Sequence, residues 1–122
     1  MPWTYSQSTG QLRHDGALVG TGYSGAGTSA ATGRNNPAMQ ATENAGPIPQ
    51  GLYTIGPLHN STNTGPNVMN LTPSGHNALG RTDFQIHGNN ATNNASHGCV
   101  IMPPAVRNAV ANSRDHQLAV IP

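Results

Sequence analysis

The residues best suited to covalent chemistry lie between positions 83 and 102. The only cysteine of the chain, Cys99, closes a Ser-His-Gly-Cys tetrad at positions 96–99, and His87 lies a short segment earlier. Thiol catalysis needs a nucleophilic sulfur, a base that takes its proton, and amide groups that stabilise the resulting oxyanion. This segment offers Cys99 as nucleophile, a histidine as base, and the amides of Gly98 and Cys99 as oxyanion donors.

Two predicted strands position these residues. Apolar and polar side chains alternate over residues 83–87, which predicts a half-buried strand that ends at His87. Residues 99–102 are apolar and predict a second strand, whereas residues 88–95 are small and polar and predict a loop. If the two strands lie side by side, the loop returns the chain and brings His87 next to Cys99.

Simpler roles for the same residues compete with this interpretation. A lone cysteine often behaves as a small apolar core residue, but the adjacent His-Gly step and the second histidine favour Cys99 as a nucleophile. His97 and Cys99 are two positions apart and point to the same side of an extended chain, so periodicity alone does not exclude His97 as the base. Gly98 allows the sharp turn that would direct the amides toward an oxyanion.

The composition predicts one β-rich domain that spans residues 1–122. Charged residues are few and Gly and Pro are frequent, which favours short strands joined by turns over a disordered chain. The formal net charge is +1 without a basic patch, so a nucleic-acid partner is not expected. A single cysteine excludes an intrachain disulfide, and no cofactor motif is visible.

The remaining segments alternate between short strands and loops. One helix is expected after Pro103-Pro104, because Val106, Ala109 and Val110 follow at helical spacing and proline is tolerated in a first turn. Polar loops are expected at 24–46, with one helical turn near Pro37, and at 58–65. Further strands are expected at 3–7, 11–13, 17–23, 51–56, 68–72 and 117–121.

The chain resembles a known enzyme superfamily. The His-Gly step at 87–88, the polar loop and the Ser-His-Gly-Cys-Val sequence at 96–100 resemble the active-site signature of the L,D-transpeptidase (YkuD-like) superfamily. Segments 1–10, 46–55 and 80–84 resemble one branch of it, the small L,D-transpeptidase-like toxins delivered by type VI secretion systems. The resemblance implies a mainly β, sandwich- or barrel-like YkuD fold with one helix after the catalytic strand.

The resemblance also assigns roles in the site. The histidine before the loop, His87, would be the base, with its ring oriented by a backbone carbonyl such as that of Gly88. His97 would then shape the pocket or support the thiolate. Two features depart from the larger cell-wall transpeptidases: the interval between His87 and Ser96 is shorter, and Ile101 occupies a position where many of them carry Asn or Arg.

Two further residues are candidates for substrate binding. Arg81 precedes the first catalytic strand, and a guanidinium can hold a carboxylate, such as those of peptidoglycan stem peptides, through two hydrogen bonds. A solvated surface arginine is the simpler alternative. Ser96 is expected to form hydrogen bonds within its turn and is a second candidate for a substrate contact.

The function implied by the resemblance is modification of tetrapeptide stems. Cys99 would attack the carbonyl of a meso-diaminopimelate residue and expel the terminal D-alanine. Water or another amine would then resolve the acyl-enzyme, which gives L,D-carboxypeptidase, D-amino-acid exchange or L,D-transpeptidase activity. The expected partners are stem peptides, the type VI secretion machinery and a cognate immunity protein, and the expected place of action is the periplasm of target bacteria.

Export and two alternative functions follow from the residues themselves. No signal peptide and no membrane-spanning run are expected, so secretion would need another route. A metal site could use His87, His97, Cys99 and one of the loop histidines, although one cysteine without paired zinc-ligand spacing argues against it. A non-catalytic wall-binding module would suit the weakly charged, turn-rich chain.

Overall fold

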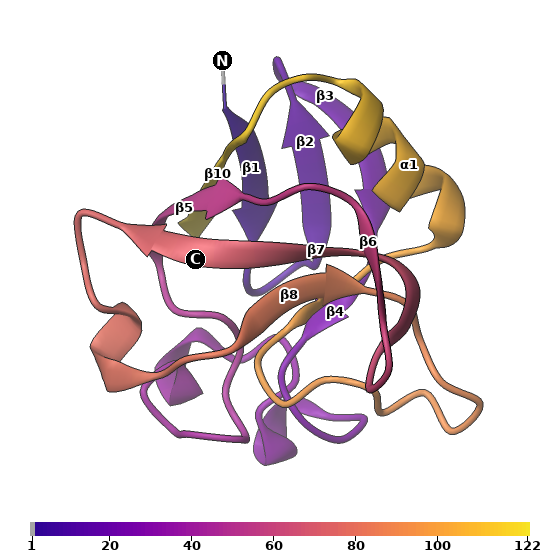
Figure 1. Ribbon diagram of the computed structural model, residues 1–122. Coiled ribbons are helices and arrows are strands. Elements are labelled where there is room, and N and C mark those ends of the chain that lie inside the picture. The colour runs from indigo at the N-terminus through magenta and orange to yellow at the C-terminus, as the bar shows by residue number, and fades with distance from the viewer. Residues whose placement is uncertain (1) are drawn as a thin grey trace.

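The computed structural model describes residues 2–122, which form a strongly curved sheet with one α-helix (Figure 1). The strand order is β3-β2-β1-β10-β5-β7-β8-β9-β4, and β6 pairs with β7. The strands are β1 (Trp3–Ser6), β2 (Gln11–His14), β3 (Ala17–Thr21), β4 (Tyr23–Ser24), β5 (Gly51–Ile55), β6 (His59–Ser61), β7 (Gly65–Ser74), β8 (Phe84–His87), β9 (Val100–Ile101) and β10 (Gln117–Ile121).

The sheet is nearly closed because its two edge strands are consecutive in the chain. Only Gly22 separates β3 from β4, yet these strands occupy opposite ends of the strand order. A Cβ atom on Gly22 would lie 1.7 Å from the carbonyl oxygen of Ile101, so this corner requires glycine. The predicted mainly β, barrel-like fold is confirmed.

The segments outside the sheet gather at two ends of the molecule. Helix α1 (Pro104–Asn112) lies beside β3 at one end and buries Val106 and Val110, as the helical spacing predicts (Figure 1). The loops and the short 3₁₀ helices η1 (Ala30–Thr32), η2 (Pro37–Met39) and η3 (Ala78–Gly80) lie at the opposite end. No helix within residues 2–122 has the length and apolar character needed to cross a membrane.

Two local predictions are wrong. The chain at 58–65 is not only a loop, because β6 forms there and pairs with β7. The single strand expected at 17–23 is broken at Gly22, where the chain passes from one edge of the sheet to the other.

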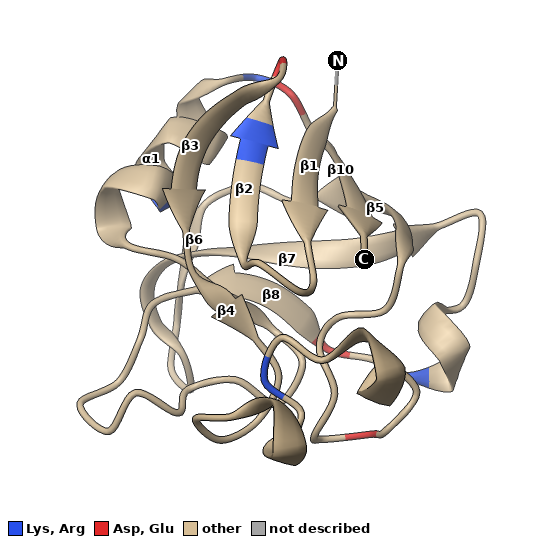
Figure 2. Ribbon diagram, turned by 180° about the vertical axis from the view of Figure 1, so that it is seen from behind, with Lys and Arg blue, Asp and Glu red and all other residues tan. Residues whose placement is uncertain are grey.

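Figure 2 shows the few charged positions dispersed over several elements, so no end of the sheet carries a concentration of one charge.

The core lies inside the curved sheet, where Tyr5 is fully buried. Its hydroxyl has no hydrogen-bond partner within residues 2–122, and a buried unpaired hydroxyl destabilises the folded state. Tyr5→Phe is therefore expected to raise the free energy of unfolding by about 1 kcal/mol in urea denaturation.

The matched control for this prediction is Tyr53→Phe. The hydroxyl of the equally buried Tyr53 donates to Pro49 O at 2.8 Å, so its removal is expected to lower stability by about 1 kcal/mol. Equal destabilisation by both substitutions would show that the Tyr5 hydroxyl forms a stabilising hydrogen bond after all.

Candidate functional site

Parallel pairing of β8 with β9 places His87, the last residue of β8, near Cys99, which directly precedes β9. Ile86 is opposite Val100, and both side chains are buried in the core. His87 follows Ile86 and Cys99 precedes Val100, so their side chains project to the other face of the sheet. The loop between the strands returns the chain as predicted.

His87 and Cys99 line the same cavity of about 260 Å³. His97, Gly98 and Arg81 line it too, so the structure brings together most of the predicted site. The cavity adjoins a polar groove of about 760 Å³, and Cys99 and Arg81 contribute to both. The cysteine therefore lies where a small pocket meets a longer surface groove.

His87 is held in one orientation by its neighbour. Its side chain is buried, and Nδ1 lies 2.9 Å from Gly88 O. A carbonyl oxygen only accepts hydrogen bonds, so Nδ1 carries the proton and Nε2 is left as the basic nitrogen. Burial lowers the pKa of His87, the bond to Gly88 opposes this shift, and the charge of Arg107 lowers the pKa further. The ring is neutral at pH 7, and the predicted contact with Gly88 is confirmed.

Cys99 is half-buried and carries a neutral thiol. Its Sγ donates to Asp83 O at a distance of 3.5 Å. Burial raises the pKa of the Cys99 thiol to about 11; a backbone hydrogen bond from Gln85 and the charge of Arg81 act in the opposite direction, and the charge of Asp83 raises the pKa. The resting site thus pairs a thiol with a neutral imidazole, and a preformed thiolate is not its resting state.

Ser96 fixes the turn that carries Cys99, and it is not a substrate contact. Its side chain is fully buried, and Oγ donates to Cys99 O at 2.6 Å. The same oxygen accepts from Gly98 N at 3.1 Å and from Gly25 N at 2.9 Å. The expected bonding within the turn is confirmed, whereas the predicted substrate contact is wrong because Ser96 is enclosed.

This bonding also changes the predicted oxyanion hole. The amide of Gly98 is bound to Ser96, so it is not free to stabilise an oxyanion, and the Cys99 amide is the remaining donor of the predicted pair. Gly98 has a φ of 134°, and an added Cβ would lie 2.5 Å from Arg81 Nη2. Glycine is required here for the shape of the turn.

Arg81 joins the long loop to the turn that precedes Cys99. Its guanidinium is buried and donates to four backbone carbonyls. Nη1 donates to Gln40 O and Pro47 O at 2.7 and 2.8 Å, and Nη2 donates to Gly46 O and His97 O at 3.0 and 3.1 Å. The prediction that Arg81 grips a substrate carboxylate is wrong, because both terminal nitrogens are already occupied. Arg81 is a positioning residue at the wall of the cavity.

Arg81→Gln is expected to lower the free energy of unfolding by about 3 kcal/mol, because buried carbonyls lose charged donors. Urea denaturation measures this loss, and Arg81→Lys should recover only part of it, since an ammonium cannot span four carbonyls. Arg13→Gln, on an exposed strand position, is the control and should change stability by less than about 0.5 kcal/mol. A loss of stability below about 0.5 kcal/mol for Arg81→Gln would contradict the role of Arg81 in binding the four carbonyls.

The other histidine lies at the rim of the cavity. His97 is exposed, and its Nδ1 lies 3.3 Å from Asn44 O of the long loop. Asn44 and Glu43 also line the cavity, and backbone groups of Asp83 and Gln85 contact the sulfur, although the sequence does not predict either. Residue type gives no signal for such backbone contacts.

The described part of the chain offers no alternative metal centre. Within residues 2–122, no group of three or more His, Cys, Asp or Glu side chains is arranged to hold a metal ion. His87, His97 and Cys99 share a cavity without forming such a group, so the metal-site alternative lacks its ligands.

Comparison with known proteins assigns the sequence to a protein family. No curated protein matches the sequence at a significant level. The Tlde1 domain, an effector domain of type VI secretion systems, matches residues 19–121, which include the long loop, strands β8 and β9 and helix α1. The match covers most of the chain, and we conclude that this protein belongs to the Tlde1 domain family.

Proposed function

We propose that this Tlde1 domain is a cysteine enzyme of the YkuD-like type that modifies the tetrapeptide stems of peptidoglycan. The observation that carries the proposal is the shared cavity, which both Cys99, just before β9, and His87, at the end of the neighbouring parallel strand β8, line. The bond between His87 Nδ1 and Gly88 O leaves Nε2 available as the base. Nucleophile, base and orienting group are the elements that thiol acyl transfer requires.

The neutral resting pair defines the first half of the proposed reaction. His87 Nε2 takes the thiol proton as Cys99 Sγ attacks the carbonyl between meso-diaminopimelate and D-alanine. The tetrahedral intermediate collapses, the carbon–nitrogen bond breaks, and His87 returns the proton to the departing amine of D-alanine. A thioester with Cys99 remains.

The second half restores the enzyme. His87 takes a proton from water or from an incoming amine, which attacks the thioester carbonyl. The carbon–sulfur bond breaks, and the sulfur regains its proton from His87. Water gives a shortened stem with a carboxylate, whereas a D-amino acid or another stem gives exchange or a cross-link.

The adjoining groove is suited to the rest of the substrate. Its walls carry uncharged hydroxyl and amide side chains, including Ser61, Asn63, Thr64 and Asn70, and Asp83 is its acidic residue. Such groups recognise the hydroxyl and amide groups of sugars and peptides through neutral hydrogen bonds. We place the remainder of the muropeptide along this groove, with the reacting carbonyl at Cys99.

Membership of the Tlde1 domain family implies a type VI secretion context. Delivery into the periplasm of a rival bacterium would bring the enzyme to its substrate. Loss or exchange of the terminal D-alanine would deplete the donors of cross-linking, and the producing cell would need a cognate immunity protein. These finer assignments belong to the proposal.

Mass spectrometry of muropeptides tests the proposed reaction. Purified protein is incubated with disaccharide-tetrapeptides, with and without an added D-amino acid. We expect the loss of one D-alanine, or its replacement by the added residue, and no change in disaccharide-tripeptides, which lack the scissile bond. Unchanged tetrapeptide masses from correctly folded protein would overturn the proposal, and saturable binding without turnover would favour the wall-binding module.

A further inference from the structure

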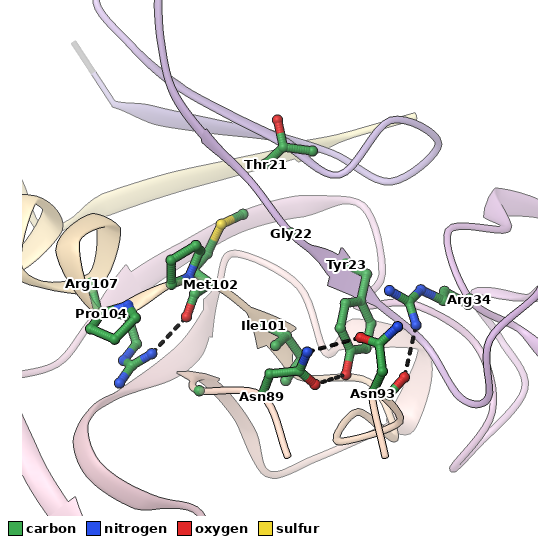
Figure 3. A pocket seen from close by; sticks show the side chains of 12 residues that line it. Thr21, Gly22, Tyr23, Arg34, Asn89, Asn93, Ile101, Met102, Pro104 and Arg107 are labelled. Carbon is green, nitrogen blue, oxygen red and sulfur yellow. Dashed lines mark hydrogen bonds between the residues drawn. The ribbon is translucent and has the colours of Figure 1, made fainter. Parts of the chain in front are cut away.

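A second cavity lies on the opposite side of the loop that joins β8 to β9. Its volume is about 560 Å³, and Gly88, Asn89 and Asn93 of that loop contribute to its wall (Figure 3). Two arginines, Arg34 and Arg107, also line it. The proposed reaction does not use this cavity, because neither His87 nor Cys99 contributes to its wall.

Arg107 brings an uncompensated charge to the cavity. Its side chain is only 5% exposed; Nε donates to Asn67 O at 2.9 Å and Nη1 donates to Met102 O at 2.6 Å. Nη2 has no hydrogen-bond partner within residues 2–122, and the ion pairs among these residues involve only His14, away from the cavity. Nη2 is open to the cavity, where no described acidic side chain neutralises its charge, so an anionic ligand there would stabilise Arg107.

Arg34 lies at the other end of the cavity. Its guanidinium stacks 3.5 Å from the ring centroid of Tyr23, and Nη1 donates to Asn93 O at 2.9 Å. Stacking and this hydrogen bond hold the charge in place while leaving other N–H groups free. No described residue of the wall is acidic, and Figure 3 shows Ile101 between the two arginines and Pro104 beside Arg107, which both add apolar surface to the wall.

We infer that this cavity binds a small, partly apolar peptide ligand whose carboxylate is attracted by the charges of Arg34 and Arg107. The identification of that ligand as a stem peptide, distinct from the one reacting at Cys99, rests on the proposed function. A guanidinium matches the geometry of a carboxylate, both arginines add positive charge to the cavity, and the apolar wall matches an alanine side chain.

The cavity is also placed to act on the catalytic histidine. A Cβ atom on Gly88 would lie 2.9 Å from Arg107 Nη1, so the two residues are in close contact. The carbonyl of Gly88 accepts the proton of His87 Nδ1. A carboxylate bound to Arg107 would therefore lie close to Gly88, whose carbonyl orients the ring of His87.

Binding can be measured without catalysis by NMR titration of the Cys99→Ala protein. The probes are N-acetyl-D-alanine, its neutral carboxamide, and inorganic phosphate. We expect saturable shifts at the amides of Tyr23, Asn89 and Met102 with N-acetyl-D-alanine, and binding at least tenfold weaker with the carboxamide. Arg34→Gln should weaken binding of N-acetyl-D-alanine at least tenfold, and Arg13→Gln should leave it unchanged.

Three results would overturn the inference. They are the absence of saturable shifts, equal binding of the carboxamide, and unchanged binding after Arg34→Gln. Phosphate that binds as tightly as N-acetyl-D-alanine would overturn the assignment to a peptide carboxylate. Arg34 is half-buried and lies in a loop, so its substitution keeps the test valid if Arg107 variants fail to fold. Since no turnover is measured, failure here and failure of the proposed reaction are distinguishable.

Discussion

Cys99→Ala is expected to lower the rate of tetrapeptide turnover by at least ~10³-fold, because the removal of a catalytic nucleophile leaves only binding and electrostatic contributions. Cys99 is the only thiol of the chain, and its Sγ opens into both the small cavity and the polar groove. Cys99→Ser should have a similar effect, since a serine hydroxyl is a far weaker acid than a thiol and the base proposed to deprotonate it is the neutral imidazole of His87 in the same cavity.

The measurement is the initial rate of D-alanine release from disaccharide-tetrapeptides. Circular dichroism and urea denaturation show whether the variants keep the fold, and Arg13→Gln prepared in parallel should retain the full rate. Turnover by correctly folded Cys99→Ala within tenfold of the unmodified protein would exclude the thioester mechanism.

Alkylation of Cys99 provides an independent check of the neutral thiol. The thiolate reacts and the thiol does not, and burial raises the pKa of Cys99 to about 11. The rate of reaction with iodoacetamide should therefore be slow at pH 7 and rise continuously as the pH approaches that value. A plateau below pH 8 would show a preformed thiolate and would contradict the neutral pair.

The parts of the site that the sequence predicts correctly depend on local periodicity. Alternation over residues 83–87 identifies β8, the polar run after it identifies the loop, and the residues that follow identify β9 and α1. A side-chain period of two also places His87 and Cys99 on one face once the strands are adjacent. These properties are set by neighbours in the chain, which a single sequence displays directly.

The parts that it predicts incorrectly depend on contacts between distant segments. The four carbonyls that bind Arg81 come from residues 40–47 and 97, and carbonyl groups are the same in every residue. The enclosure of Ser96 depends on Gly25, which only the packed loop brings to it. Closure of the sheet through Gly22 requires the position of Ile101, which local pattern does not give.

The choice between the two histidines has the second large expected effect. His87→Gln should lower turnover by about 10²–10⁴-fold, the usual contribution of a general base. His97→Gln should lower it by less than about tenfold, because His97 is exposed at the rim. The matched pair of substitutions separates proton transfer from the shape of the pocket, because both residues line the same cavity.

The pH profile makes the distinction independent of rate. Burial lowers the pKa of His87, so its imidazole becomes protonated only at a pH below the usual histidine pKa of about 6.5. Activity should therefore be retained at pH 6.5 and fall only at lower pH, as protonated His87 can no longer accept the thiol proton. His97→Gln should keep this acidic limb, and His87→Gln should lose it along with most of the rate. If instead His97→Gln removes the limb while His87→Gln keeps it, the base is His97, and the bond from His87 to Gly88 serves only to hold the turn after β8.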